Sequence, residues 1–475
     1  MMGRKDRQLQ MVMFSVDEFI PEKHLLRAID KNIDFSFIYE KAAPYYSEKG
    51  RPSIDPVCLM KMLLTGYLYG IKSERRLVEE VALNLAYRWF CGFELYDKIP
   101  DHSIFSQNRR RRFTDSDIFK EIFNHIVCEC VNKGLVSGEN VVSDGSFIPA
   151  NVTASSLMET TKEVKQSTVQ YLDALDDELR QQVGYKEPTP TVKEKTIISS
   201  ITDPNCGYIS HETKKGLGYI AEMTTDTDNG IILGVDCYPA NQRESSIVLK
   251  HIDNIQSSTG VNINGLGLDA GYDVGAVHRG LELLGITGYV SPIQFNNDVL
   301  KQDVEYIPKS DCFKCMAGKF LCFEKIVYKK STQNYYRLYQ FSKADRKSCR
   351  TCEHRSKCSF SYGTPRINTS AFYPAFYQNR KRCETLEYKT MKRLRGIWAE
   401  GTFSALKREH NLSKTVKRGL HRVHEECLLS ALALNLKRMV WALDKRNVLL
   451  NGSDSYDFSM IVRICLIHRV AYIAA

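Results

Sequence analysis

Asn140-Val141-Val142-Ser143-Asp144-Gly145-Ser146-Phe147-Ile148 is the segment from which the fold class can be inferred. Its β-branched and apolar residues predict a buried strand, and Asp144 is the acidic residue within it. An ionised carboxylate in such a strand is costly unless it is paired or bound to a metal ion. A second predicted strand, Asn264 to Asp269, also ends in a carboxylate and is followed by Gly271. If the two strands are neighbours in one sheet, Asp144 and Asp269 converge at one site.

Strands and helices alternate around these two acidic strands. The alternation predicts a mixed α/β sheet with helical cover. Residues 157–183 are charged and are expected to form a mostly helical excursion. Further strands are expected at 196–202, 218–225, 231–238 and 287–291, and helices at 245–255 and 274–284.

The first 130 residues predict a helical domain. Ser53-Ile54-Asp55-Pro56 is a helix start signal with a proline suited to the first turn, and Ser73 can cap another helix. A basic helix end suits DNA binding, but it equally suits the solvated end of a helical bundle, and the sequence leaves both open. The third predicted helix ends in four consecutive arginines, Arg109, Arg110, Arg111 and Arg112.

Residues 293–385 interrupt the alternation with cysteines, many aromatic residues and no long helical period. Two long helices are expected after them, at 386–410 and 422–446. The predicted domains are a helical domain (1–130), the first part of the α/β core (137–292, with the excursion at 157–192), a cysteine-rich insertion (293–385), the second part of the core (386–446) and a tail (447–475).

The composition favours a globular protein with an acidic polymer as its partner. The 475 residues carry 66 lysines and arginines against 56 acids, a net charge of +10. Hydrophobic residues at 43% and charged residues at 26% exclude wholesale disorder. The 15 cysteines, with no recognisable signal peptide, are expected to be mostly reduced. The apolar stretch 458–475 contains Arg463, His468 and Arg469, so no membrane span is expected there.

Glu400 is the best candidate for the third acid of a divalent-metal site. It lies in a predicted helix with an apolar stripe, and Lys407 follows seven residues later on the same face. Residues 380–422 hold thirteen lysines and arginines and four acids, 13 − 4 = +9, which favours phosphodiester chemistry. Oxygen ligands select Mg²⁺ or Mn²⁺. Two such ions can stabilise both the entering and the leaving oxygen of a displacement at phosphorus.

Three other acids compete for places in this site. Asp273 lies four residues after Asp269 and is expected instead to cap the helix that begins near Val274. Glu425 and Glu426 could replace Glu400, but the apolar helix after them favours a role at its start.

With these motifs in order, the chain resembles bacterial insertion-sequence transposases that carry a DDE catalytic site on an RNase H-like fold. The resemblance covers most of residues 15–446, and the order and spacing of the motifs make it specific. It is carried by Gly50-Arg51-Pro52-Ser53-Ile54-Asp55-Pro56, Arg75-Arg76-Leu77, Tyr87-Arg88-Trp89-Phe90, Ile99-Pro100-Asp101-His102-Ser103, Val142-Ser143-Asp144-Gly145, Leu268-Asp269-Ala270-Gly271-Tyr272-Asp273, and Glu400-Gly401-Thr402-Phe403 leading to Lys407.

The resemblance implies that Asp144, Asp269 and Glu400 bind two Mg²⁺ or Mn²⁺ ions and that Lys407 holds DNA. It implies a DNA recombination enzyme that cuts the terminal inverted repeats of a transposable element and joins the freed 3′-hydroxyl to target DNA. Such an enzyme is expected to act as a homodimer in the cytoplasm, on the nucleoid and away from membranes. A nuclease that cuts without joining and an inactive DNA-binding derivative are the alternatives. Further candidates for phosphate contact are Lys214, Lys215, Lys414, Lys417 and Arg418.

One departure from the family pattern lies just before the glutamate. Related enzymes often carry a tyrosine and an arginine there at fixed spacing. Here Gly396 and Ile397 stand four and three residues before Glu400, and the nearest arginine is Arg395. The sequence alone assigns no role to this arginine.

The cysteines of the insertion have the spacing of zinc knuckles, Cys312-x2-Cys315 and Cys349-x2-Cys352-x5-Cys358. Four of the five would hold a structural zinc ion: the last four, or a set in which Cys312 replaces one of them. Metal-free thiols, a disulfide and a DNA-contacting role are the alternatives. Cysteines expected in apolar helices as core residues are Cys58, Cys91, Cys128, Cys130 and Cys427.

Overall fold

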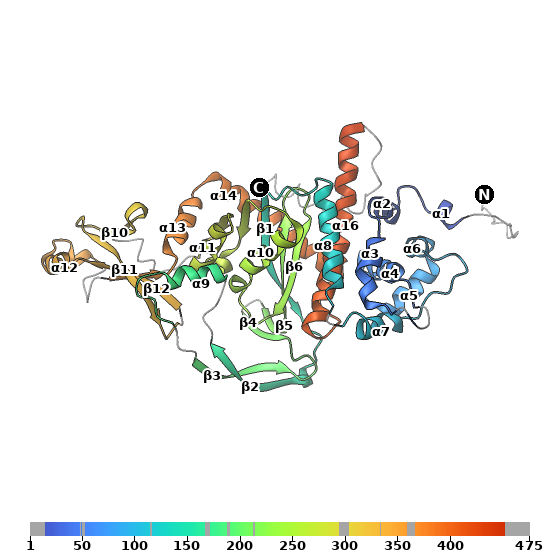
Figure 1. The fold of residues 1–475 in the computed structure, drawn as a ribbon, viewed down its shortest axis with the longest axis horizontal. Coiled ribbons are helices and arrows are strands. Elements are labelled where there is room, and N and C mark those ends of the chain that lie inside the picture. Colours follow the sequence, from blue (N-terminus) through green and yellow to red (C-terminus); the bar gives the residue numbers. More distant parts are fainter. Residues whose placement is uncertain are drawn as a thin grey trace, which may run out of the picture. The chain divides into compact units, whose positions relative to one another are not determined.

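Figure 1 shows the fold of the computed structural model, which divides into two compact units. The first unit holds residues 1–130, 408–411 and 428–475, and the second holds 131–407 and 412–427, each as far as its described residues extend. The described residues are 15–47, 49, 53–114, 116–166, 172–187, 191–211, 214–293, 304–332, 334–358 and 366–451.

The amino-terminal part of the first unit is helical, which confirms the sequence prediction. Asp55 caps the helix Pro56–Leu68 by accepting hydrogen bonds from the backbone N–H groups of Val57 and Cys58. Ser73 caps the next helix through the N–H of Arg76. The helices are α1 (Val16–Phe19), α2 (Leu25–Asn32), α3 (Phe37–Ala42), α4 (Pro56–Leu68), α5 (Glu74–Leu83), α6 (Leu85–Cys91), α7 (Ser103–Arg111) and α8 (Ile118–Asn132).

A mixed sheet forms the core of the second unit. Strand β5 pairs antiparallel with β1 and with β6, and β1 continues into the parallel neighbours β7 and β8. An antiparallel meander extended by two parallel strands is the arrangement of an RNase H-like sheet, so the predicted fold class is confirmed. The strands are β1 (Asn140–Pro149), β4 (Gly207–His211), β5 (Lys214–Asp226), β6 (Ile232–Pro239), β7 (Gly265–Leu268) and β8 (Thr287–Val290).

Helices pack on both faces of this sheet. Neighbouring side chains of β1 point to opposite faces, so Val142 and Ser143 identify the two sides. Val142 packs with Met391 of α14 (Leu386–Arg395). On the other side Thr224, hydrogen-bonded to Ser143, contacts His251 of α10 (Val248–Thr259). A further helix, α11 (Gly275–Leu283), connects β7 to β8.

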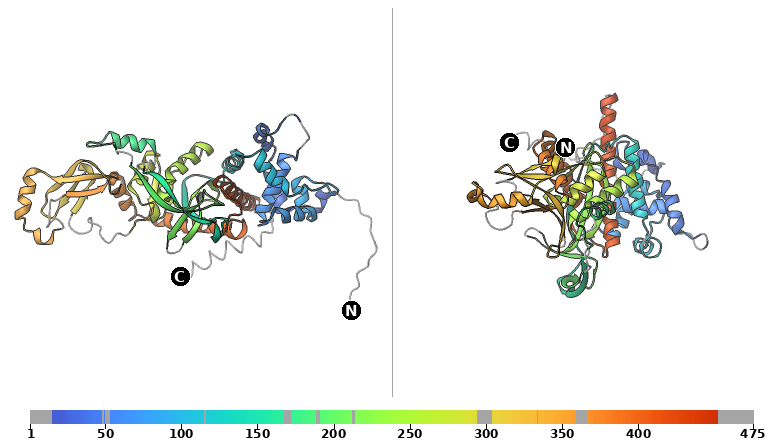
Figure 2. Two further views of the ribbon diagram at one scale, coloured as in Figure 1. Left: turned by 90° about the horizontal axis from the view of Figure 1, so that it is seen from below. Right: turned by 60° about the vertical axis from the view of Figure 1, so that its left-hand side comes forward.

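The expectation of a mostly helical excursion at 157–183 is wrong. Strand β2 (Leu157–Gln166) pairs antiparallel with β3 (Thr191–Ser200), and the two form a twisted ribbon in Figure 2. Among the described residues of that stretch, only α9 (Asp173–Arg180) is helical. Thr160, Thr161 and Val164 of β2 are β-branched, and such residues favour strands more than the charged character of the segment favours a helix.

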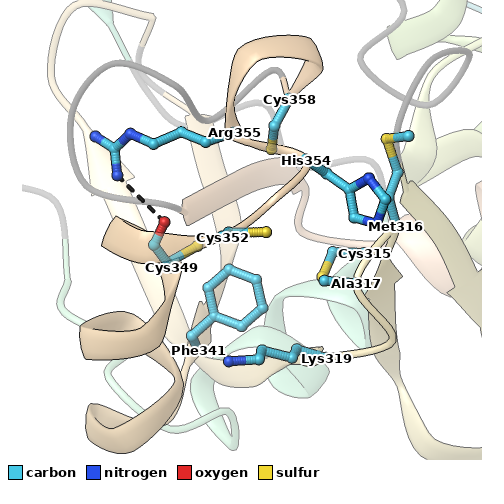
Figure 3. A pocket seen from close by; sticks show the side chains of 10 residues that line it. All are labelled: Cys315, Met316, Ala317, Lys319, Phe341, Cys349, Cys352, His354, Arg355 and Cys358. Atoms are coloured by element: carbon cyan, nitrogen blue, oxygen red, sulfur yellow. Dashed lines mark hydrogen bonds between the residues drawn. The ribbon is translucent and has the colours of Figure 1, made fainter.

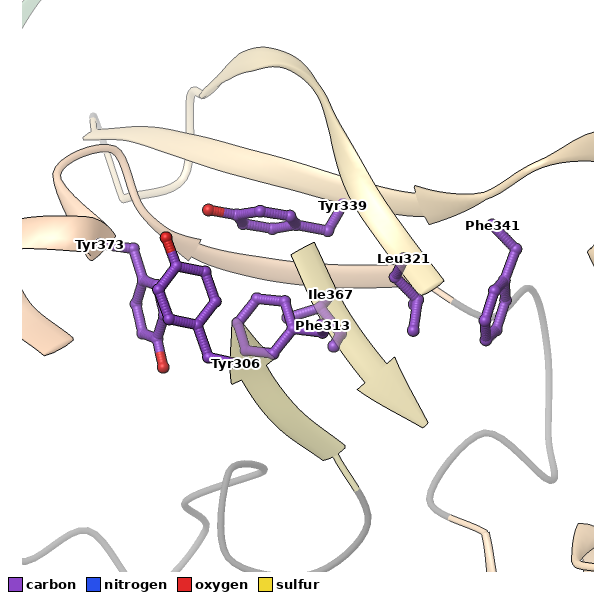
Figure 4. Close-up of a cluster of buried hydrophobic side chains, with 7 residues drawn as sticks. All are labelled: Tyr306, Phe313, Leu321, Tyr339, Phe341, Ile367 and Tyr373. Carbon is purple, nitrogen blue, oxygen red and sulfur yellow. The ribbon is translucent and has the colours of Figure 1, made fainter. Parts of the chain in front are cut away.

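The cysteine-rich insertion is built on a five-stranded antiparallel sheet, which the sequence analysis did not predict. Aromatic side chains fill its core, where the ring of Tyr339 meets those of Tyr306 and Phe313 edge to face (Figure 4). Tyr373, the first residue of α13, joins the same cluster. The elements are β9 (Val304–Ile307), β10 (Cys312–Cys315), β11 (Phe320–Lys329), β12 (Asn334–Phe341), α12 (Lys343–Ser348), β13 (Arg366–Ser370) and α13 (Tyr373–Arg382).

The two predicted carboxy-terminal helices are present. The first, however, is interrupted by a π-helical turn, Gly396–Glu400, between α14 and α15 (Gly401–Glu409). The second is α16 (Leu420–Asn451), so the predicted tail begins within a helix, and its continuation from residue 452 lies outside the described residues. In the part of the chain that the structure describes, no helix is both long and apolar enough to cross a membrane.

Candidate active site

Asp144 lies on β1, and Asp269 directly follows the neighbouring strand β7. Val142 of β1 stands opposite Gly267 of β7 in a parallel register. Asp144 and Asp269 each come two residues later, and the backbone of Asp269 is still extended, so the two carboxylates share one face of the sheet. Adjacent paired strands are about 4.8 Å apart, and both acidic residues lie two positions beyond the last pair of this stretch. The Asp269 carboxylate also accepts a hydrogen bond from Gly271 N at 2.7 Å, which holds the turn after the strand.

Glu400 reaches the same face through Arg395. The Arg395 guanidinium lies 3.5 Å from a carboxylate oxygen of Asp144 and 3.5 Å from one of Glu400. The exposed fraction is 17% for the Asp144 side chain and 66% for that of Glu400. The structure therefore joins the strand acid and the helix acid through a single positive charge, at a site that stays open to solvent.

The π turn explains how Arg395 can face Glu400. In an α-helix, residues four apart share a face, whereas a π turn bonds residues five apart. Arg395 and Glu400 are five residues apart and span the π turn Gly396–Glu400. The extra residue of the π turn thus lets an arginine five positions before Glu400 face its carboxylate.

Lys407 lies on the same side of the sheet as Asp144. Its ammonium group donates a hydrogen bond of 2.7 Å to the hydroxyl of Ser146, which is two residues after Asp144 on β1. The helix segment that carries Glu400 therefore also places a lysine next to the acidic strand.

Behind the acidic strands lies a buried network that the sequence analysis missed. The Tyr272 hydroxyl donates to both carboxyl oxygens of Glu222, at 2.9 and 2.7 Å, and the Ser143 hydroxyl donates to the same group at 2.8 Å. Burial raises the pKa of Glu222 well above its usual value, and the negative charges of Glu244 and Asp144 raise it further. Ser143 precedes Asp144, and Tyr272 ends the turn after Asp269, so the network ties both acidic segments to β5.

Glu244 brings another carboxylate close to these turns. A Cβ atom on Gly145 would stand 2.7 Å from one of its carboxyl oxygens, and a Cβ on Gly271 would stand 3.4 Å from the other. Glycine at position 145 therefore leaves room for Glu244 beside the acidic segments, whereas a Cβ at position 271 would make an ordinary contact with it. The sequence around Glu244 did not predict this contact. Glu244 begins the η3 turn (Glu244–Ser246), and its contact with the acidic segments depends on the position of that turn in the fold.

The rival acids have structural partners. Asp273 does not cap α11 as expected, because the cap position is Val274 and has no side-chain hydrogen bond. Asp273 instead pairs with His278 and Arg380, both at 2.9 Å. The carboxylate of Glu426 accepts from the backbone N–H groups of Val416 and Lys417.

No curated protein sequence matches the chain. Among solved structures, the match to the piggyBac transposase synaptic complex with hairpin DNA covers 90% of this chain and 83% of that chain, at 11% identity and a TM-score of 0.28. The match to the Mos1 mariner paired-end complex with Mn covers 55% of this chain and 68% of that chain, at 11% identity and a TM-score of 0.17.

Two family matches follow the order of the motifs. Residues 14–111 match a family described as Transposase domain (DUF772), and residues 314–440 match one described as Transposase DDE domain. The second match includes Glu400 and Lys407. The chain is a DNA transposase of the DDE type.

The basic residues of the transposase that were expected to contact DNA differ in exposure. Arg109 is buried and ion-paired with Glu74 within the first unit, so it belongs to that unit's packing. The Arg112 guanidinium lies over the ring of Tyr46, and the side chain of Lys214 lies outside the described part of the chain. Residues that are exposed are Arg110, Arg111, Lys215, Lys414 and Arg418, and Lys417 is half-buried.

The structure also separates the cysteines of the transposase's insertion. Cys315, Cys349, Cys352 and Cys358 line one cavity, whereas Cys312 is buried in the sheet and donates to the Ser310 carbonyl. Burial raises the pKa of the Cys349 thiol, and the nearby Cys358, Cys352 and Cys315 raise it further. Of the five expected core cysteines, those fully buried are Cys91, Cys130 and Cys427, and those half-buried are Cys58 and Cys128.

Proposed function

We propose that Asp144, Asp269 and Glu400 hold two Mg²⁺ or Mn²⁺ ions and that the chain cuts and joins DNA at this site. The single observation that carries the proposal is the convergence of Asp144 and Glu400 on Arg395, with Asp269 directly after the strand that pairs with that of Asp144. Bound there, the ions would neutralise charge at phosphorus and stabilise the entering and leaving oxygens.

The donor set fits such ions in its chemistry. All three groups are carboxylates, the oxygen ligands that Mg²⁺ and Mn²⁺ prefer. Among the described residues, no group of three or more acidic, histidine or cysteine side chains already stands in a metal-coordinating arrangement. The guanidinium of Arg395 is the positive charge between Asp144 and Glu400. Metal binding therefore requires the Arg395 side chain to leave Asp144 and Glu400. After this movement its guanidinium can contact a phosphate group of the DNA.

The chain's own residues then orient the DNA. Lys407 beside Ser146 provides a cation next to the acids, and Lys414, Lys417 and Arg418 continue the basic segment after it. We infer that these residues track the phosphate backbone, so binding weakens steeply with salt. Water is the nucleophile for cutting and a DNA 3′-hydroxyl is the nucleophile for joining, and positioning and charge neutralisation supply the catalysis.

Joining requires both ends of the element to be held together. We therefore propose that the terminal inverted repeats and target DNA are bound by at least a homodimer. Cross-linking of the chain with paired repeat ends should give a dimeric species that repeat-free DNA does not support. A monomer on paired ends would contradict this part of the proposal.

The test substitutes each acid in turn: Asp144→Asn, Asp269→Asn and Glu400→Gln. Each variant should bind repeat DNA as the unchanged chain does, and should lose Mg²⁺-dependent cleavage and joining. Titration with Mn²⁺, followed by electron paramagnetic resonance, should show weaker metal binding in each variant without reference to activity. Asp253→Asn, an exposed acid on α10, is the matched control and should change neither measurement. Full joining activity in any of the three variants would remove that residue from the site.

Two alternative functions are separated by the substrate. Pre-cut ends that carry a 3′-hydroxyl should give joined product with a transposase, and should give none with a nuclease that only cuts. An inactive DNA-binding derivative would bind the repeats and do neither.

A further inference from the structure

Four cysteines line one small cavity in the insertion. The cavity has a volume of about 30 Å³, which suits one small ion or one water molecule. Figure 3 shows the side chains arranged around it. Cys315 comes from the end of β10, whereas Cys349, Cys352 and Cys358 come from the two short 3-10 turns Cys349–Thr351 and Arg355–Lys357 and their ends.

We propose that Cys315, Cys349, Cys352 and Cys358 bind a structural Zn²⁺ ion as four thiolates. Structural zinc sites are closed and tetrahedral, and cysteine pairs separated by two residues commonly supply half of the ligands. Cys349 and Cys352 form such a pair, Cys358 follows after five residues, and Cys315 completes the set from another strand. This proposal is independent of the chemistry proposed for the acidic site.

Cys312 is excluded from the set by its place in the sheet. It is buried, pairs in register with Cys322 of β11, and its thiol donates to the Ser310 carbonyl at 3.1 Å. Neither Cys312 nor Cys322 lines the cavity. The spacing of the sequence allowed Cys312 as a ligand, and the geometry removes it.

The surroundings compensate the charge of the site. Four thiolates and one Zn²⁺ carry a net charge of −2, and binding releases four protons to the solvent. Lys319 and Arg355 both line the cavity and supply positive charge. The Arg355 guanidinium also donates to the Cys349 carbonyl at 3.2 Å, so it fixes the turn that carries two of the ligands.

The thiols do not yet stand at coordinating positions. No three of them form a metal-holding group among the described residues, so the site closes by rotation of the side chains. A thiol moves by about 3 Å when χ1 changes between staggered positions, which is enough to cross a cavity of this size. Metal binding and ordering of the turns are therefore coupled.

The zinc ion would connect the turns to the aromatic core of the insertion. Cys315 and Cys349 pack against the cluster that contains Phe341 and Tyr373, and Phe341 also lines the cavity. Loss of the metal should therefore loosen this cluster as well as the turns.

The experiment uses the full-length chain. Zinc measured by mass spectrometry of the purified protein should amount to one ion per chain, and Cys352→Ser should reduce it to a small fraction of that value. Cys322→Ser, an exposed cysteine of the same sheet, is the matched control and should keep the ion. Cys312→Ser should also keep it.

Cobalt substitution makes the result independent of whether a variant folds. The unchanged chain loaded with Co²⁺ should show the visible absorption of a tetrahedral thiolate site, and added Zn²⁺ should remove it. Chelation should make four additional thiols reactive and lower the melting temperature. A chain that takes up neither metal, a disulfide among the four cysteines, or loss of the ion in Cys312→Ser would overturn the assignment.

Discussion

Arg395 and Glu400 are five residues apart in the chain, and their side chains meet at 3.5 Å across a π-helical turn. Single π turns inside α-helices occur frequently at functional sites. Here the turn lets one guanidinium face both Glu400 and the strand acid Asp144. The local geometry of the helix thus places Arg395 at the acidic site.

Removal of this guanidinium should separate metal binding from catalysis. In Arg395→Ala, Asp144 and Glu400 lose the positive charge between them, so Mn²⁺ binding should be retained or strengthened. Strand joining should fall by about 100-fold or more, because a positioned cation that stabilises transition-state charge is lost. Gel assays of joining and Mn²⁺ titration measure the two effects.

Arg393→Ala is the control for this substitution, because Arg393 is exposed on the same helix. It should leave both measurements unchanged. Equal loss in the two variants would show that general basic charge, rather than the position of Arg395, is responsible.

The hydroxyl of Tyr272 should act as a positioning group for the acidic segments. Tyr272→Phe removes both hydrogen bonds to Glu222 and should lower stability by about 1–3 kcal/mol, because it leaves a buried carboxyl with one partner fewer. Joining should fall by about 10- to 100-fold at saturating DNA, as is typical when groups that orient metal ligands are changed. Urea unfolding and joining rates measure the two losses.

The matched variant Tyr208→Phe lies on the edge strand β4 and should have little effect. Tyr272→Phe should also weaken Mn²⁺ binding, a readout that a purely structural role would not change. Unaltered Mn²⁺ affinity would limit the network to folding.

The main sheet was predictable because its signals are local. Composition alone predicts the valine-rich strand around Asp144 and the strand segment that leads to Asp269. The alternation of strands and helices along the chain then predicts an α/β core. The strands of the insertion were missed because aromatic residues such as Tyr306 and Phe313 pack only after distant strands have paired. The local sequence pattern does not predict which distant strands pair.

The site divides in the same way. Asp144, Asp269 and Glu400 were selected by residue type and neighbouring sequence. Glu222 and Tyr272 could not be selected, because their contact joins residues fifty positions apart and depends on the register of β5 against β1. The choice of Cys315 rather than Cys312 as a cavity-lining cysteine likewise required the three-dimensional structure.

Glu222 should make stability depend on pH in a specific direction. Its pKa is raised in the folded chain, so above the ordinary glutamate pKa near 4.5 the folded state keeps a proton that the unfolded state releases. Stability is therefore lost as pH rises from that value, by about 1.4 kcal/mol per pH unit until the folded group ionises.

Glu222→Gln removes this titration while it keeps the shape of the neutral group. The difference in unfolding free energy between Glu222→Gln and the unchanged chain should therefore grow in favour of the variant from about pH 4.5 towards pH 7. Urea unfolding at a series of pH values measures it. A difference that stays constant over this range would show that Glu222 is not protonated in the folded chain.

Gly230 should be required for the position of Trp398, two residues before Glu400. Gly230 has a φ of +74°, and a Cβ atom there would stand 2.6 Å from Cε3 of the Trp398 ring. Gly285 has the same φ of +74°, but a Cβ atom there would meet nothing within 4 Å.

Gly285→Ala should thus cost only the backbone strain, about 1–2 kcal/mol. Gly230→Ala should cost about 1–3 kcal/mol more through overpacking, and it should also lower joining at temperatures where both variants are folded, because the displaced indole shifts the π turn. Thermal unfolding and joining assays on the pair measure this, and equal behaviour of the two variants would show that Trp398 does not set the position of Glu400.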